Sequence, residues 1–94
     1  MTADGTATLA DLRDDIDALD HEIANLVADR MALADEVAEV KVDAGTDLVD
    51  EDREAVVESR YADVFEEQGL DGDQGESLAR FLIETSLERE RQVE

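Results

Sequence analysis

The chain has 94 residues, of which 28 are acidic and 8 are lysine or arginine, so its formal charge at pH 7 is -20. Such a charge repels phosphate and argues against nucleic acid as a partner, and the lack of cysteine excludes disulfides and thiolate chemistry. The acids lie singly and in pairs, which is typical of solvated helix faces, and with a single lysine in the chain they suggest a protein from a high-salt cytoplasm.

The composition predicts an all-helical fold. Proline and tryptophan are missing, and Ala, Leu, Val, Glu, Asp and Arg dominate between the few glycines. We predict one domain over residues 1–94, with a disordered tail over residues 1–7. A chain this short buries about 60–65% of its unfolded surface, so we expect partner subunits. Because the sequence has neither a signal-peptide pattern nor a membrane-spanning apolar run, we expect a cytoplasmic protein.

The first predicted helix is long and carries an apolar seam that is interrupted once, by Arg30. Thr8 and Asp11 have the spacing of a capping box at its start, and Gly45 marks its end. At 1.5 Å per residue, it is about 50 Å long, roughly twice the diameter of a domain of this size, so most of it must pack on another chain. The seam consists of Leu9, Leu12, Ile16, Leu19, Ile23, Leu26, Leu33, Val37 and Val40.

An antiparallel two-fold dimer is the simplest way to cover this seam. With the helix midpoint near residue 25, Arg13 of one subunit would lie between Arg30 and Lys41 of the other. Arg30 and Lys41 are three turns apart on one helix face, about 16 Å along the axis, so three cations would cluster. Such a cluster is costly unless it is neutralised, either by Asp50 and Glu54 or by a small polyanion.

The second predicted helix begins near Asp50 and ends before Gly69. The third begins with Asp73 and Glu76 in capping-box spacing. The second helix presents Val56, Val57, Tyr61, Val64 and Phe65, and the third presents Leu78, Leu82, Ile83, Ser86 and Leu87. We expect Tyr61 and both phenylalanines to lie in the core. His21, the only histidine, is expected to be solvated.

Each cation taken alone also has a structural interpretation. Arg30 could fix the register of a helical pair, as polar residues in coiled-coil seams do. Arg53 could form a surface ion pair with Asp50 or Glu54, worth at most about 1 kcal/mol. Lys41 could stabilise the negative end of its helix.

Three charged patterns follow one another along the chain: LADLRDDIDALDHEIANLVADRMALADEVAEVK, then VDEDREAVV, then FLIETSLERE. Together they resemble the all-helical chorismate mutase family, from about Leu9 to Arg91. The resemblance implies three helices in an intertwined homodimer with two active sites. It also implies the pericyclic rearrangement of chorismate to prephenate, on the route to phenylalanine and tyrosine, without a cofactor or metal.

The resemblance also implies roles for individual residues. Arg13 from the partner subunit and Arg30 would each bind one substrate carboxylate. Lys41 would donate a hydrogen bond to the ether oxygen whose bond breaks. Asp50 and Glu54 would hold the substrate hydroxyl and orient Lys41.

Further site residues follow from the second and third patterns. Arg53 would support the site and Ser86 would line it. Glu90 stands where the best-known bacterial form has a glutamine that donates a hydrogen bond to the ether oxygen. Because an ionised carboxylate only accepts hydrogen bonds, Glu90 must be protonated to donate one to that oxygen. The apolar walls would be formed by Val37, Val57, Ile83 and Leu87.

Two other functions remain open from the sequence. A near relative with the same fold is an isochorismate pyruvate-lyase that uses much the same anion site. A non-catalytic acidic helical dimerisation module would keep the dimer but bind no chorismate.

Overall fold

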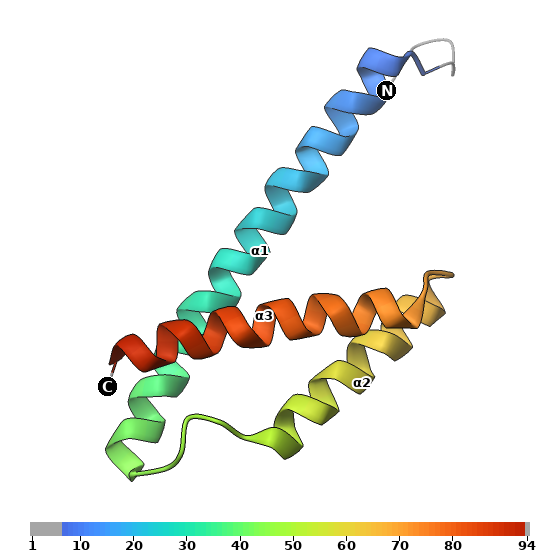
Figure 1. The fold of residues 1–94 in the computed structure, drawn as a ribbon. Coiled ribbons are helices and arrows are strands. Elements are labelled where there is room, and N and C mark those ends of the chain that lie inside the picture. Colours follow the sequence, from blue (N-terminus) through green and yellow to red (C-terminus); the bar gives the residue numbers. More distant parts are fainter. Residues whose placement is uncertain (1–6, 94) are drawn as a thin grey trace. The chain divides into compact units, whose positions relative to one another are not determined.

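The computed structural model describes residues 7–93 and contains three helices, α1 (Leu9–Ala44), α2 (Glu51–Glu67) and α3 (Gly72–Val93) (Figure 1). The predicted all-helical fold, with one long and two shorter helices, is thereby confirmed. Residues 1–6 of the predicted tail lie outside the described residues. The chain divides after Arg30 into two compact units, each described by itself below, and the single domain stays a prediction. None of the helices within residues 7–93 combines the length and apolar character needed to cross a membrane.

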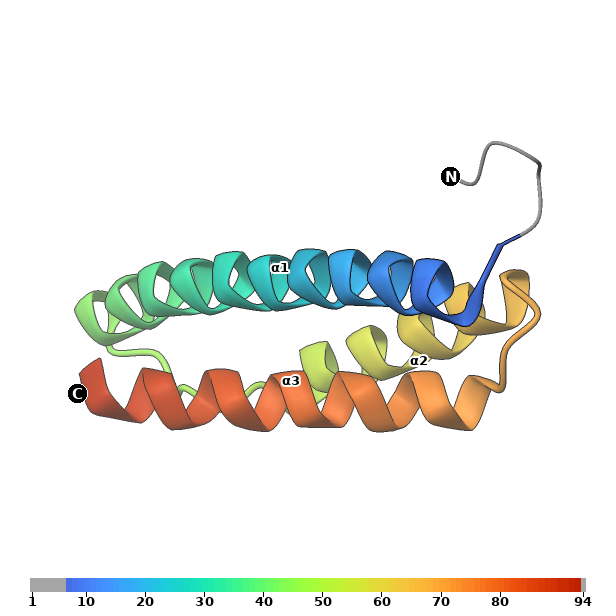
Figure 2. The ribbon, with the colours of Figure 1, turned by 90° about the horizontal axis from the view of Figure 1, so that it is seen from above.

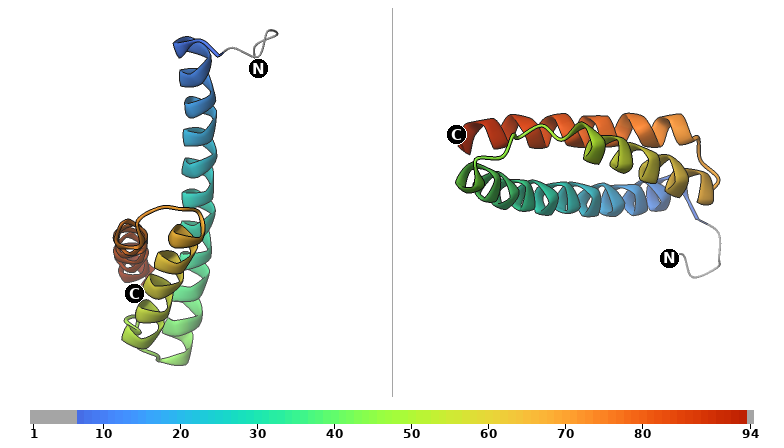
Figure 3. Two further views of the ribbon diagram at one scale, coloured as in Figure 1. Left: turned by 90° about the vertical axis from the view of Figure 1, so that its right-hand side faces the viewer. Right: turned by 90° about the horizontal axis from the view of Figure 1, so that it is seen from below.

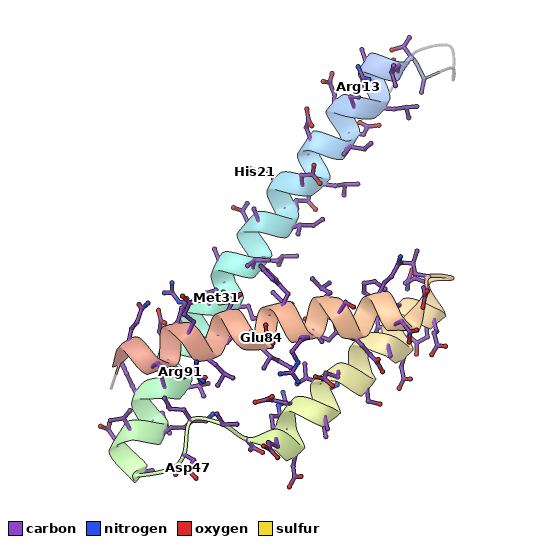
Figure 4. All side chains as sticks on the ribbon, in the orientation of Figure 1. Arg13, His21, Met31, Asp47, Glu84 and Arg91 are labelled. Atoms are coloured by element: carbon purple, nitrogen blue, oxygen red, sulfur yellow. The ribbon has the colours of Figure 1, made fainter. Side chains whose placement is uncertain are left out.

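The first unit is the N-terminal part of α1, and it begins with the predicted capping box. Thr8 Oγ1 accepts a hydrogen bond from the Asp11 amide at 3.1 Å, and Asp11 Oδ2 accepts one from the Thr8 amide at 3.1 Å. His21 is exposed, as predicted, and projects from the helix with Arg13 on the same segment (Figure 4). The seam residues between Leu9 and Leu26 are 49% to 66% exposed. No part of the first unit that the structure describes covers this apolar face.

Both ends of α2 are formed by local hydrogen bonds. Asp50 is the N-cap, and its Oδ1 accepts a hydrogen bond from the Arg53 amide at 3.0 Å. At the other end, Gly69 has a φ of +77°, a conformation that glycine adopts without strain. The Leu70 amide then reaches back to the Phe65 carbonyl at 2.8 Å, as in a Schellman motif. The predicted start and stop of the second helix are both confirmed.

The start of α3 differs from the prediction. The capping carboxylate belongs to Asp71, whose Oδ1 accepts a hydrogen bond from the Asp73 amide at 2.8 Å. Asp73 already lies inside the helix, which begins at Gly72. The prediction of Asp73 as the cap is therefore wrong by two residues, because two aspartates stand close together and either could cap.

Helices α2 and α3 lie side by side and run in opposite directions (Figures 2 and 3). Gly75 permits their close approach, because a Cβ atom there would lie 2.5 Å from the Tyr61 carbonyl oxygen. Val57, Ala79 and Ile83 form the buried cluster between the helices. Tyr61 and Leu87 are partly buried and pack against that cluster.

The C-terminal part of α1 belongs to the same unit as α2 and α3. It buries Met31, Ala34 and Ala38, which share one helix face at steps of three and four residues. An ion pair joins this part of α1 to α3. Arg89 Nε donates a hydrogen bond to Asp35 Oδ1 at 3.0 Å, and Arg89 Nη2 donates one to Asp35 Oδ2 at 2.5 Å. These contacts connect the last turns of α1 to the second half of α3.

The aromatic residues follow the prediction in part. Tyr61 packs on the core and Phe65 is half-buried. Phe81, however, is 60% exposed, so its assignment to the core is wrong. Its neighbours Leu82 and Ile83 lie on the buried face of α3, whereas Phe81 lies outside that face.

Candidate active site

The structure places Lys41 in the last turn of α1, where its ammonium group has two partners. Nζ donates a hydrogen bond to the Leu48 carbonyl oxygen at 2.7 Å. It also lies 3.7 Å from Glu90 Oε1, so that Lys41 and Glu90 form an ion pair between α1 and α3. Lys41 is half-buried. These two contacts orient the ammonium group, a role that was predicted from the sequence for Asp50 and Glu54.

Glu90 is a buried acid, with 5% of its surface exposed. Burying a carboxylate is costly without a partner, and Lys41 supplies one. Ser86 lies one turn earlier on the same face of α3, half-buried, and its hydroxyl donates to the Leu82 carbonyl at 2.8 Å and lies 3.8 Å from Met31 Sδ. The structure thus brings Lys41, Ser86 and Glu90 to neighbouring turns of α1 and α3.

The acids of α2 have distinct surroundings. Asp50 Oδ1 accepts the capping hydrogen bond from the Arg53 amide, and the Arg53 side chain is exposed. Glu54 is half-buried, and its Oε1 accepts a hydrogen bond from Arg80 Nη1 on α3 at 3.0 Å. Its other oxygen, Oε2, is buried and receives no hydrogen bond from the part of the chain that the structure describes. Glu54 therefore keeps an acceptor that a bound hydroxyl could use.

Three of the four predicted wall residues come together. Val57 and Ile83 are buried in one cluster, and Leu87 packs against it. Val37 is 46% exposed and lies on the seam face of α1. The structure thus gathers the predicted wall residues of α2 and α3, and the role of all four residues in lining a substrate site stays a prediction.

A shallow depression of about 420 Å³ lies where α1 is connected to α2. Lys41 and Asp50 both line it, so the structure brings these two predicted site residues to one concave surface. Asp47 lies in the connecting segment (Figure 4). The remaining lining residues are Thr46, Asp47, Val49, Glu51 and Asp52.

The two predicted carboxylate-binding arginines belong to the first unit. Arg13 is exposed, and Arg30, the last residue of that unit, is half-buried. Their placement beside Lys41 and Glu90 stays a prediction from the helical spacing of the sequence.

Two arginines of α3 were not predicted from the sequence as functional residues. Arg80 bridges Glu54 and Glu58, and the hydrogen bonds with Glu58 and then Glu54 raise the pKa of its guanidinium above the ordinary value. Arg89 holds Asp35, and its hydrogen bond lowers the pKa of that carboxyl below the ordinary value of 3.8. A signal for Arg80 was available, because it precedes Ile83 and Leu87 by three and seven residues and so lies on the predicted wall face.

The fold and the site define a small all-helical protein in which a lysine and a buried glutamate from two helices meet beside an apolar cluster. Comparison with known proteins gives the family. The family described as chorismate mutase type II matches residues 12–91. A chorismate mutase of Methanocaldococcus jannaschii is 33% identical over 84 residues, which cover 89% of this chain and 85% of the relative. The chain belongs to the type II chorismate mutase family.

Proposed function

We propose that this chain converts chorismate to prephenate with a site built around Lys41 and Glu90. In this reaction, one carbon–oxygen bond of the substrate breaks while one carbon–carbon bond forms within the same molecule. The protein needs to supply no nucleophile and no proton acceptor. It can accelerate the reaction by holding the reactive conformer and by stabilising negative charge that develops on the ether oxygen.

The observation that carries the proposal is the Lys41–Glu90 pair in a chain of this family. An ammonium group that is half-buried and held in place by the Leu48 carbonyl is a preorganised donor. It has further N–H groups besides the one that donates to Leu48, and one of these can donate to the ether oxygen. A protonated Glu90 would provide a second donor to the same oxygen.

The remaining roles concern substrate binding. Arg30 and the partner subunit's Arg13 would bind the two carboxylates, because a guanidinium suits a carboxylate in a bidentate geometry. Glu54 would accept a hydrogen bond from the substrate hydroxyl through Oε2, which supports this role by being buried and open to a donor. Asp50 would hold the substrate hydroxyl together with Glu54, Arg53 would support the site, and Ser86 would line it.

A homodimer is part of the proposal, because Arg13 is expected to act across the subunit interface. The exposed seam of α1 supports it. An apolar stripe of this length is costly to leave in water, and the same stripe of a second copy would cover it.

The test is to incubate the purified protein in molar salt with chorismate and, separately, with isochorismate. We expect chorismate to be consumed and prephenate to form, with no pyruvate released from either substrate. Release of pyruvate from isochorismate as the faster reaction would favour the lyase, and no turnover of either substrate would favour the dimerisation module.

A further inference from the structure

Arg80 connects α3 to two acids of α2. Its Nη1 donates to Glu54 Oε1 at 3.0 Å, and its Nη2 donates to Glu58. The Glu54 side chain is 16% exposed and that of Arg80 is 41% exposed, so the carboxylate is the better shielded member of the pair. Glu54 thus depends on Arg80 for the neutralisation of a partly buried charge.

The two oxygens of Glu54 have different surroundings. Oε1 is held by Arg80, whereas Oε2 is buried and accepts no hydrogen bond from any group within residues 7–93. Buried polar atoms nearly always have a partner, so Oε2 is an acceptor that a donor group of a ligand can use. The hydrogen bond from Arg80 to Oε1 restricts the rotation of the carboxylate, and with it the direction of Oε2.

The Arg80–Glu54 ion pair lies beside the apolar cluster of Val57, Ala79 and Ile83. Arg80 precedes Ile83 by three residues on α3, and Glu54 precedes Val57 by three residues on α2. Residues three apart share a helix face, and Val57 and Ile83 belong to one buried cluster. The ion pair therefore continues the same interface between α2 and α3 that carries two predicted wall residues.

We propose that Arg80 is a positioning residue for the mutase reaction, which acts through Glu54. It aims Glu54 Oε2 at the substrate hydroxyl, and it neutralises a carboxylate that would otherwise repel a substrate with two negative charges. This inference rests on the proposed function. Arg80 itself touches no reacting atom.

The experiment compares Arg80→Gln and Arg80→Lys with the wild type, in molar salt, and repeats Arg80→Gln in a Glu54→Gln background. For Arg80→Gln, we expect KM for chorismate to rise about tenfold, a modest effect because the guanidinium is partly exposed. Arg80→Lys should recover most of the loss, since an ammonium group can still donate to Glu54. In the Glu54→Gln background, Arg80→Gln should change KM by less than about twofold, because the group it positions is already altered.

Glu58→Gln is the matched control, since it removes the other acid from Arg80 and leaves the Arg80–Glu54 contact in place. We expect KM close to that of the wild type, and thermal melting of all variants reports any structural loss. If Arg80→Gln lowers Tm but leaves KM unchanged, or raises KM equally in both backgrounds, the inference is overturned while the proposed function stands. A wild type without chorismate turnover overturns the proposed function, and the inference with it.

Discussion

Lys41 Nζ lies 3.7 Å from Glu90 Oε1, and the Glu90 side chain is buried. In the proposed mechanism, both groups face the ether oxygen of the substrate. An ionised Glu90 would pair with Lys41 and oppose charge developing on that oxygen, whereas a protonated Glu90 would donate a hydrogen bond to it.

We therefore expect Glu90→Gln to retain turnover, because an amide can donate a hydrogen bond to the ether oxygen whereas an ionised carboxylate only accepts one. Steady-state rates of the variant and the wild type at pH 7 would check this. A Glu90→Gln variant without activity would contradict the placement of this side chain beside the ether oxygen.

A variant of Arg30 distinguishes two roles for this seam residue, which are binding the substrate and fixing the register of the helical pair. Arg30→Ala should lower kcat/KM by a factor of about 10² or more, because a preorganised partner of a substrate carboxylate is lost. Sedimentation in molar salt should show an unchanged dimer. A variant that changes oligomeric state and retains turnover would support the register role instead.

Much of the fold is set by interactions between neighbouring residues, and these were predictable. The Thr8–Asp11 box, the Asp50 cap and the Gly69 stop all involve partners within five residues. The start of α3 was misplaced because Asp71 and Asp73 offer the same chemistry two residues apart. The choice between them depends on where the preceding turn ends.

The arginines of α3 could not be paired from the sequence. Arg80 is 22 and 26 residues from its partners, and Arg89 is 54 residues from Asp35. In a chain with 28 acids, each arginine has many possible partners, and only the packing of the helices selects among them. The family resemblance implied that Lys41 and Glu90 both face the ether oxygen, but it implied neither the ion pair between them nor the Leu48 carbonyl that holds Lys41.

Gly75 should tolerate no side chain. In Gly75→Ala, the new Cβ would meet the Tyr61 carbonyl oxygen at 2.5 Å, so α2 and α3 must separate. We expect a loss of about 1–3 kcal/mol in the free energy of unfolding, as for overpacked cores. Gly72→Ala is the control, since its Cβ would meet the flexible Glu66 side chain at 3.2 Å. Equal denaturation midpoints for the two variants would show that the close approach is not needed.

The Asp35–Arg89 pair predicts a pH dependence of stability. Arg89 lowers the pKa of Asp35 in the folded state below its ordinary value of 3.8. The contribution of the pair is therefore complete above about pH 4 and is lost as the pH falls through the lower folded-state pKa. Asp35→Asn should be less stable than the wild type at pH 7, and the difference should shrink in more acidic buffer.

Denaturant unfolding between pH 7 and pH 3 would measure this difference. Glu36→Gln serves as the control, because Glu36 is exposed and has no ion pair within the described chain. If the free energies of unfolding of Asp35→Asn and the wild type differ by the same amount over this whole pH range, the pair does not act through its charge.

Subunit mixing tests whether each site combines Lys41 of one subunit with Arg13 of its partner. Arg13→Ala and Lys41→Ala should each be inactive alone, because both sites of either homodimer lack one cation. When the two variants are unfolded and refolded together in molar salt, half the dimers should be mixed, and each of these has one intact site. We expect recovery of about a quarter of wild-type chorismate turnover. Activity no higher than the sum of the separate variants would show that Lys41 and Arg13 do not share a site across the interface.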